Sequence, residues 1–170
     1  MLIRRIAMFA AVAVLSSCAP RPAPPAPQPP APQPQARPPA PLPPPPVQWE
    51  DSPLSVGDWT YRNEGNSSAA TFGSGNGVAF TIRCEPGRRV TLALAGAGRS
   101  PLTVRTTYGG RSLAAEPRPG ALVATIAASD ALLDQIAFSR GRFAVEAEGA
   151  GRLILPAWPE TARVAEDCRG

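Results

Sequence analysis

The sequence predicts a mainly β fold, an antiparallel β-sandwich or partly open barrel with two short helices in its C-terminal half. Three observations favour this class. Apolar and polar residues alternate through the first half of the region after residue 48. Turn dipeptides recur there at intervals of about eight to twelve residues. Helical periodicity appears only late in the chain. A Pro-rich segment, which we expect to be disordered, precedes this region and has too few apolar residues to form a core.

The expected strands follow a period of two. Val78, Phe80, Ile82 and Cys84 alternate with small or polar residues, which predicts that these four share one buried face. Asn76-Gly77 and Gly109-Gly110 are typical of hairpin turns. Further strands are expected at 58–62, 69–72, 90–94, 102–108, 111–115, 121–127, 142–148 and 152–155.

Two helices are expected after these strands. The first spans 130–138, with Ser129 as its N-cap and a leucine-rich apolar face. The second spans 159–168 and begins with a proline, which suits a first helical turn. Arg163 and Asp167 lie four residues apart on it and are expected to pair.

Residues 1–18 have the parts of an export signal. Two arginines precede an apolar run at 6–15, and two small serines precede Cys18. The run is shorter than the about 20 residues that a transmembrane helix needs. Leu15-Ser16-Ser17-Cys18 resembles the lipobox of bacterial lipoproteins. That resemblance implies removal of residues 1–17 and lipid (a diacylglyceryl thioether and an N-terminal acyl chain such as palmitate) on Cys18. An ordinary signal peptide, with Cys18 incidental, is the alternative.

The segment after Cys18 is dominated by proline. Of the 28 residues in 19–46, 16 are Pro. Polyproline II geometry would make this segment a semi-rigid spacer of roughly 85 Å if fully extended. Ala19 follows the lipobox cysteine, whereas an Asp there is the inner-membrane retention signal of such lipoproteins. We therefore expect a signal peptide at 1–17, an acylated tether at 18–48 facing the periplasm from the outer membrane, and a periplasmic domain at 49–170.

The remaining two cysteines are expected to form a disulfide. Cys84 faces the core from a predicted strand, and Cys168 shares the inward face of the second helix with Val164. An exported protein with an even number of cysteines outside the lipobox favours a bond between them. Two buried free thiols are the alternative.

The composition excludes several kinds of chemistry. The chain carries a formal net charge of +4, but all the excess arginines lie in the signal and tether, and no nucleic-acid partner is expected. Histidine and lysine are both absent. Nucleophilic catalysis that uses a His or Lys base is therefore excluded, and metal binding lacks its commonest ligand. We expect no catalytic residue, no metal and no cofactor.

Carboxylate pairs are the remaining route to catalysis. Asp130 and Asp134 lie four apart on a predicted helix, and Glu146 and Glu148 two apart on a predicted strand. Paired carboxylates can hydrolyse glycosides. The alternation of Glu146 and Glu148 with apolar residues, however, is that of an ordinary solvated strand face, and the first turn of a helix favours an acidic residue.

Candidate binding residues occur in two late connections. Arg140 and Arg142 flank Gly141 between the first helix and a strand, and two such guanidinium groups could hold a carboxylate or phosphate. The same residues could equally form a helix C-terminus in which Gly141 adopts the left-handed conformation. Trp158 lies in a proline-bounded corner, either packed on the sheet or exposed for binding.

These observations predict a membrane-anchored envelope lipoprotein whose domain binds, without catalysis, an envelope protein or a cell-wall component such as peptidoglycan. The alternative is an envelope enzyme that acts on peptidoglycan or saccharide through carboxylates. The membrane is the first expected partner, through the lipid on Cys18.

Overall fold

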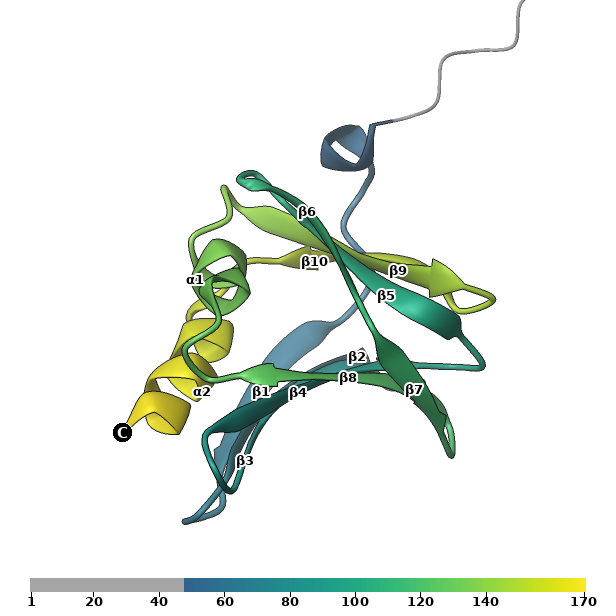
Figure 1. Ribbon diagram of the computed structural model, residues 1–170. Helices are drawn as coiled ribbons and strands as arrows, with labels where there is room; N and C mark the ends of the chain where they lie inside the picture. Colours follow the sequence, from purple (N-terminus) through teal and green to yellow (C-terminus); the bar gives the residue numbers. More distant parts are fainter. Residues whose placement is uncertain (1–47) are drawn as a thin grey trace, which may run out of the picture. The chain divides into compact units, whose positions relative to one another are not determined.

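The computed structural model describes residues 48–170, which form two antiparallel β-sheets and two α-helices (Figure 1). The mainly β class and the two late helices predicted from sequence are confirmed. The expected signal peptide, the lipid site Cys18 and the tether up to residue 47 lie outside the described residues.

The two sheets form a sandwich in which every neighbouring strand pair is antiparallel. Sheet A contains, in spatial order, β1 (Asp58–Asn63), β2 (Ser68–Ser74), β3 (Gly77–Glu85), β4 (Arg89–Ala95), β8 (Ala121–Ala127) and β7 (Ala115–Arg118). Sheet B contains β10 (Gly151–Pro156), β9 (Arg142–Glu148), β5 (Arg99–Thr106) and β6 (Gly109–Leu113). Strands β6 and β7 follow each other almost directly, so the chain crosses from sheet B to sheet A along one side of the sandwich (Figure 1).

The core lies between the sheets and is built on aromatic side chains. The Trp59 ring contacts Phe72 edge-on at a centroid distance of 5.4 Å and stacks with Phe143 of sheet B at 6.3 Å. Its indole Nε1–H donates to the carbonyl oxygen of Pro156 in β10, at 2.9 Å. Trp59 therefore joins the two sheets through both an apolar and a polar contact.

The period-two prediction is confirmed for most of β3 and is wrong at its first residues. Phe80, Ile82 and Cys84 are buried, but Val78 is 55% exposed. The register between β2 and β3 shifts between Phe72 and Gly73, so that the strand changes phase near the hairpin. An irregularity of this kind shifts the alternation of inward and outward side chains by one residue, so Val78 does not share the buried face of Phe80.

The Gly109-Gly110 turn prediction is also wrong by two residues. Both glycines belong to β6, and the turn falls at Thr107 and Tyr108. The buried hydroxyl of Thr106 stabilises this position, because it donates to the Gly109 carbonyl at 3.1 Å and accepts from the Tyr108 N–H at 3.2 Å. Hydrogen bonds of the Thr106 hydroxyl therefore stabilise a turn at 107–108, in place of the turn that we expect at the two glycines.

Helix α1 (Ala131–Ala137) begins at a different cap from the predicted one. Asp130, not Ser129, is the N-cap, and its Oδ1 accepts the Leu132 N–H at 2.9 Å. Asp130 has extended backbone angles, which let its carboxylate reach the free N–H groups of the first turn. Leu132, Leu133 and Ile136 are buried, as the apolar face predicts.

Helix α2 (Pro159–Arg169) packs on β1 to β4 of sheet A and against α1, at one end of the sandwich (Figure 1). The expected Arg163–Asp167 ion pair is not formed, and both side chains contact Tyr61 of β1 instead. The Arg163 guanidinium lies 4.2 Å from the centre of the Tyr61 ring, and Asp167 accepts the Tyr61 hydroxyl at 2.5 Å.

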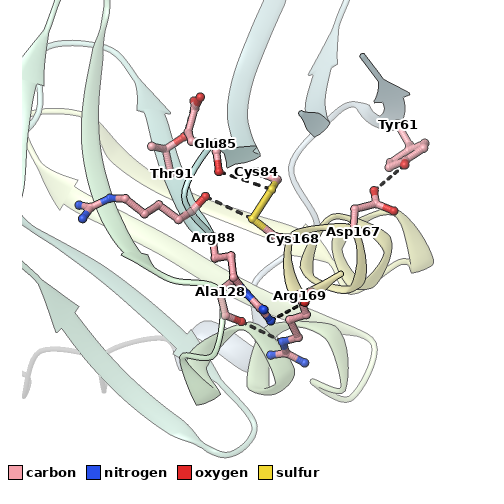
Figure 2. The surroundings of a disulfide bond; sticks show 10 residues. Tyr61, Cys84, Glu85, Arg88, Thr91, Ala128, Asp167, Cys168 and Arg169 are labelled. Atoms are coloured by element: carbon pink, nitrogen blue, oxygen red, sulfur yellow. Dashed lines mark hydrogen bonds between the residues drawn. A yellow bond between two sulfur atoms is a disulfide. The ribbon is translucent and has the colours of Figure 1, made fainter. Parts of the chain in front are cut away.

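The end of α2 is held to β3 and to the loop before α1. The Cys84 and Cys168 sulfurs lie at bonding distance (Figure 2). Their Cα atoms are 5.3 Å apart. Arg88 also donates to the carbonyl of Arg169, and Arg169 Nε donates to the carbonyl of Ala128 at 2.8 Å. The predicted cysteine pair is thus brought together at the C-terminus of the chain.

We expect the Cys84→Ala/Cys168→Ala variant to unfold with a free energy lower by about 4.6 kcal/mol, because the bond closes a loop with a sequence separation of 84. Urea unfolding of both proteins, with and without reductant, measures the difference. Wild type in reductant should match the variant. A wild type whose midpoint does not depend on reductant would contradict the disulfide.

Candidate functional site

Three connections meet at the end of the sandwich where the helices lie. They are the β5–β6 turn, the α1–β9 loop and the β10–α2 corner (Figure 1). The Thr107 N–H donates to Ser139 Oγ, and the Arg140 N–H donates to Thr107 Oγ1, both at 3.1 Å. The Ala157 N–H donates to the Gly141 carbonyl at 3.2 Å. The turn and the loop are therefore joined through the hydroxyl groups of Thr107 and Ser139, and the loop and the corner through their backbones.

Each of these connections exposes one aromatic side chain. Tyr108 in the turn is 62% exposed, Phe138 in the loop 68% and Trp158 in the corner 43%. The other aromatic side chains within 48–170 are buried or half-buried. The exposed aromatic residues of the described chain are thus gathered at one end. We call Tyr108, Phe138, Arg140 and Trp158 the aromatic loop surface.

The two candidate arginines do different work. Arg140 is exposed, and no carboxylate within residues 48–170 lies within salt-bridge distance of its guanidinium. Arg142 instead donates through Nη1 to the carbonyls of Ser52 at 2.7 Å and Glu50 at 3.1 Å. Of these two arginines, only Arg140 therefore has a guanidinium that is available to bind a ligand.

Arg142 holds the leading segment, residues 48–57, against sheet B. Trp49 begins a short 3-10 helix there (Trp49–Asp51) and is buried against Ala144 and Ile154, apart from the main core. Further along, the Ser55 N–H donates to the Ile154 carbonyl at 2.8 Å. Trp49 therefore covers one face of sheet B, and Arg142 stabilises that cover.

The sequence identified Arg140 and Trp158 but missed Tyr108 and Phe138. Phe138 follows the last helical residue, but the expected helix 130–138 includes it, and an aromatic residue in an amphipathic helix normally indicates core packing. The expected strand 102–108 includes Tyr108, because the sequence predicts the turn two residues later than it occurs. Gly141 has a φ of +74°, the left-handed conformation predicted for it.

The Glu146 carboxylate belongs to an arginine network on the outer face of sheet B. It accepts from Arg105 Nε at 2.7 Å and from Arg152 Nε at 2.5 Å. Burial acts to raise its pKa, but the hydrogen bonds and charges of the two arginines outweigh burial and hold the pKa below its ordinary value of 4.5. A general acid needs a raised pKa, so this environment is the opposite of the one that acid catalysis requires.

The other candidate carboxylates are also engaged. Asp130 caps α1 and accepts from Arg111 at 2.5 Å, and although burial acts to raise its pKa, these contacts lower it. Asp134 pairs with Arg169 at 2.8 Å, and Glu148 pairs with Arg99. An open hollow of about 470 Å³ lies beside the Glu146 network, lined by Pro101, Thr103, Glu146, Ala147, Glu148, Gly151 and Arg152.

Residues 48–170 contain no cluster of acidic and cysteine side chains able to hold a metal ion. Within the same residues, no helix combines the length and apolar character needed to cross a bilayer. Comparison with known proteins finds no matching family, no matching curated protein and no matching solved structure.

Replacing Arg142 by Ala should lower the free energy of unfolding by about 1–3 kcal/mol, because two backbone carbonyls lose a charged donor. Arg140→Ala is the matched control and should change it by less than about 0.5 kcal/mol, as an exposed substitution. Denaturant unfolding of both variants measures the difference. Equal losses would contradict the separate roles.

Glu146 should make stability depend on acid pH. Its folded pKa is lowered, so its contribution is present above pH 4.5 and is lost as the pH falls through the folded value. Glu146→Gln should therefore be less stable than wild type at pH 7, and this difference should shrink below pH 4.5. Urea unfolding of both proteins from pH 7 to pH 2.5 measures it, and a difference that stays constant over this range would contradict the role of Glu146.

Proposed function

We propose that this chain is a bacterial envelope lipoprotein, anchored through lipid on Cys18, whose domain at 49–170 is a non-catalytic binding or accessory module. Its partner is an envelope protein or a cell-wall component. The lipobox-like sequence supports the anchor, and the absence of the Asp retention signal supports the outer membrane. The Pro-rich tether at 18–48 would then hold the module away from the membrane surface.

The observation that carries the proposal is the aromatic loop surface. The hydrophobic effect drives apolar side chains inward, yet each of three hydrogen-bonded connections exposes an aromatic side chain. One of these connections also carries Arg140, whose guanidinium has no carboxylate partner within residues 48–170. Tryptophan, tyrosine and arginine are the residues that contribute most to binding energy at interfaces. This surface therefore has the composition of a site that gains apolar burial when a partner covers it.

The frame beneath the surface favours binding as well. The hydrogen bonds of Thr107, Ser139 and Arg140 tie the turn to the loop, and the backbone of Gly141 accepts from the corner. Loops that are already ordered lose less conformational entropy when they bind. The alternative, a carboxylate hydrolase, gains less support, because the carboxylates that it would use are paired with arginines.

A photo-crosslinking amino acid at position 108, in the full-length protein in cells, tests the proposal. We expect it to capture a defined envelope protein or wall fragment, since position 108 belongs to the proposed binding surface. The matched control is the same amino acid at position 116 in β7, at the far end of the sandwich from the helices (Figure 1). Mass spectrometry of the captured material identifies the partner.

Capture at position 108 should fall in a Cys18→Ser chain, because that chain lacks the lipid that would place the module at the outer membrane. Equal capture at positions 108 and 116 would contradict a site at the loop end. Capture no greater than that of an unrelated domain on the same signal and tether would contradict the module itself.

A further inference from the structure

The side chains that the aromatic loop surface exposes favour one class of ligand. The exposed large apolar side chains on its three connections are all aromatic: Tyr108, Phe138 and Trp158. The exposed large aliphatic side chains of residues 48–170 lie elsewhere in the chain, Leu54 and Val56 in the leading segment and Val78 in β3. The three connections therefore expose aromatic rings and no large aliphatic side chain of their own.

Flat aromatic faces suit sugar rings. The face of an aromatic ring is electron-rich and its edge electron-poor, so it attracts groups that carry partial positive charge. The axial C–H groups of a pyranose ring form such a face, while the hydroxyl groups around the ring remain in water. Tyr108 and Trp158 add a hydroxyl and an N–H that can bind those hydroxyl groups at the rim.

Arg140 adds a requirement for negative charge. Arg140 is exposed two residues after Phe138 and has no carboxylate partner within residues 48–170, whereas seven other arginines there form ion pairs. A guanidinium binds a carboxylate through two parallel hydrogen bonds. A ligand that satisfies the whole surface presents sugar rings together with anionic groups, and in the wall polymer, a partner class of the proposed function, those groups are carboxylates.

We infer that the aromatic loop surface binds a carboxylate-bearing glycan strand of the cell wall, that is, peptidoglycan with its stem-peptide carboxylates. The inference rests on the proposed function and narrows its partner from any envelope component to the wall polymer. Tyr108, Phe138 and Trp158 stack on sugar rings, and Arg140 pairs with a carboxylate. A repeating polymer also suits a surface spread over three connections, since neighbouring units can occupy neighbouring aromatic rings.

The test is co-sedimentation of the full-length protein, in detergent, with purified insoluble peptidoglycan. Wild type should bind, and Arg140→Ala should weaken binding about tenfold or more through the lost charge-assisted hydrogen bonds. Each of Tyr108→Ala, Phe138→Ala and Trp158→Ala should weaken it about threefold to tenfold. Arg118→Ala, which removes an equal charge from the edge strand β7, should bind as wild type.

Chemical amidation of the wall carboxylates gives a second readout that misfolding cannot mimic. Wild type should bind amidated peptidoglycan as weakly as Arg140→Ala binds the native polymer, and Arg140→Ala should not respond to amidation. Polygalacturonate, whose carboxylates belong to its sugars, distinguishes the two carboxylate sources. Binding to polygalacturonate without binding to peptidoglycan would overturn the assignment to stem-peptide carboxylates.

Failure of this inference can be told apart from failure of the proposed function. No sedimentation with peptidoglycan, or sedimentation that none of the four substitutions weakens, overturns the glycan inference. If crosslinking from position 108 still captures a defined envelope protein, the binding module stands with a protein partner. Loss of both results overturns the module as well.

Discussion

The contact between Trp59 and the end of β10 is the interaction on which the rest of the domain depends. Trp59 fills the space between the sheets, touching Phe72 of sheet A and Phe143 of sheet B, and donates to the Pro156 carbonyl. Pro156 is the last residue of β10, and α2 begins three residues later. One side chain thus sets the spacing of the sheets and the point at which the chain turns toward its final helix.

Helix α2 extends this constraint to the end of the sandwich. It packs on sheet A and on α1, and the Cys84–Cys168 pair holds its last turn to β3 (Figure 2). A domain of this size buries a modest core, and a covalent link that restricts the unfolded chain compensates for that. The corner between β10 and α2 is held at both ends, and Trp158 is therefore presented from a rigid position.

The arginines divide into structural groups and one group available at the proposed surface. Arg105 and Arg152 neutralise Glu146, Arg169 joins α2 to α1, and Arg142 secures the leading segment. These roles arise because a chain without lysine must use guanidinium groups for every ion pair, and their several donors can hold carbonyls as well as carboxylates. Arg140, two residues from Arg142 and on the far side of Gly141, is left without such a partner.

The sequence by itself determined the fold class, most strand positions, the two helices and the burial of both domain cysteines, because these follow from local periodicity and turn chemistry. It did not predict β7 as a separate strand or the position of the β5–β6 turn. Tertiary structure decided which side chains meet. It placed Asp130 as a cap, turned Val78 outward through a register shift, and separated the roles of Arg140 and Arg142. It also joined the turn that carries Tyr108 to the loop that carries Phe138 and Arg140, through hydrogen bonds between residues about 30 positions apart, which leave no trace in the local sequence pattern.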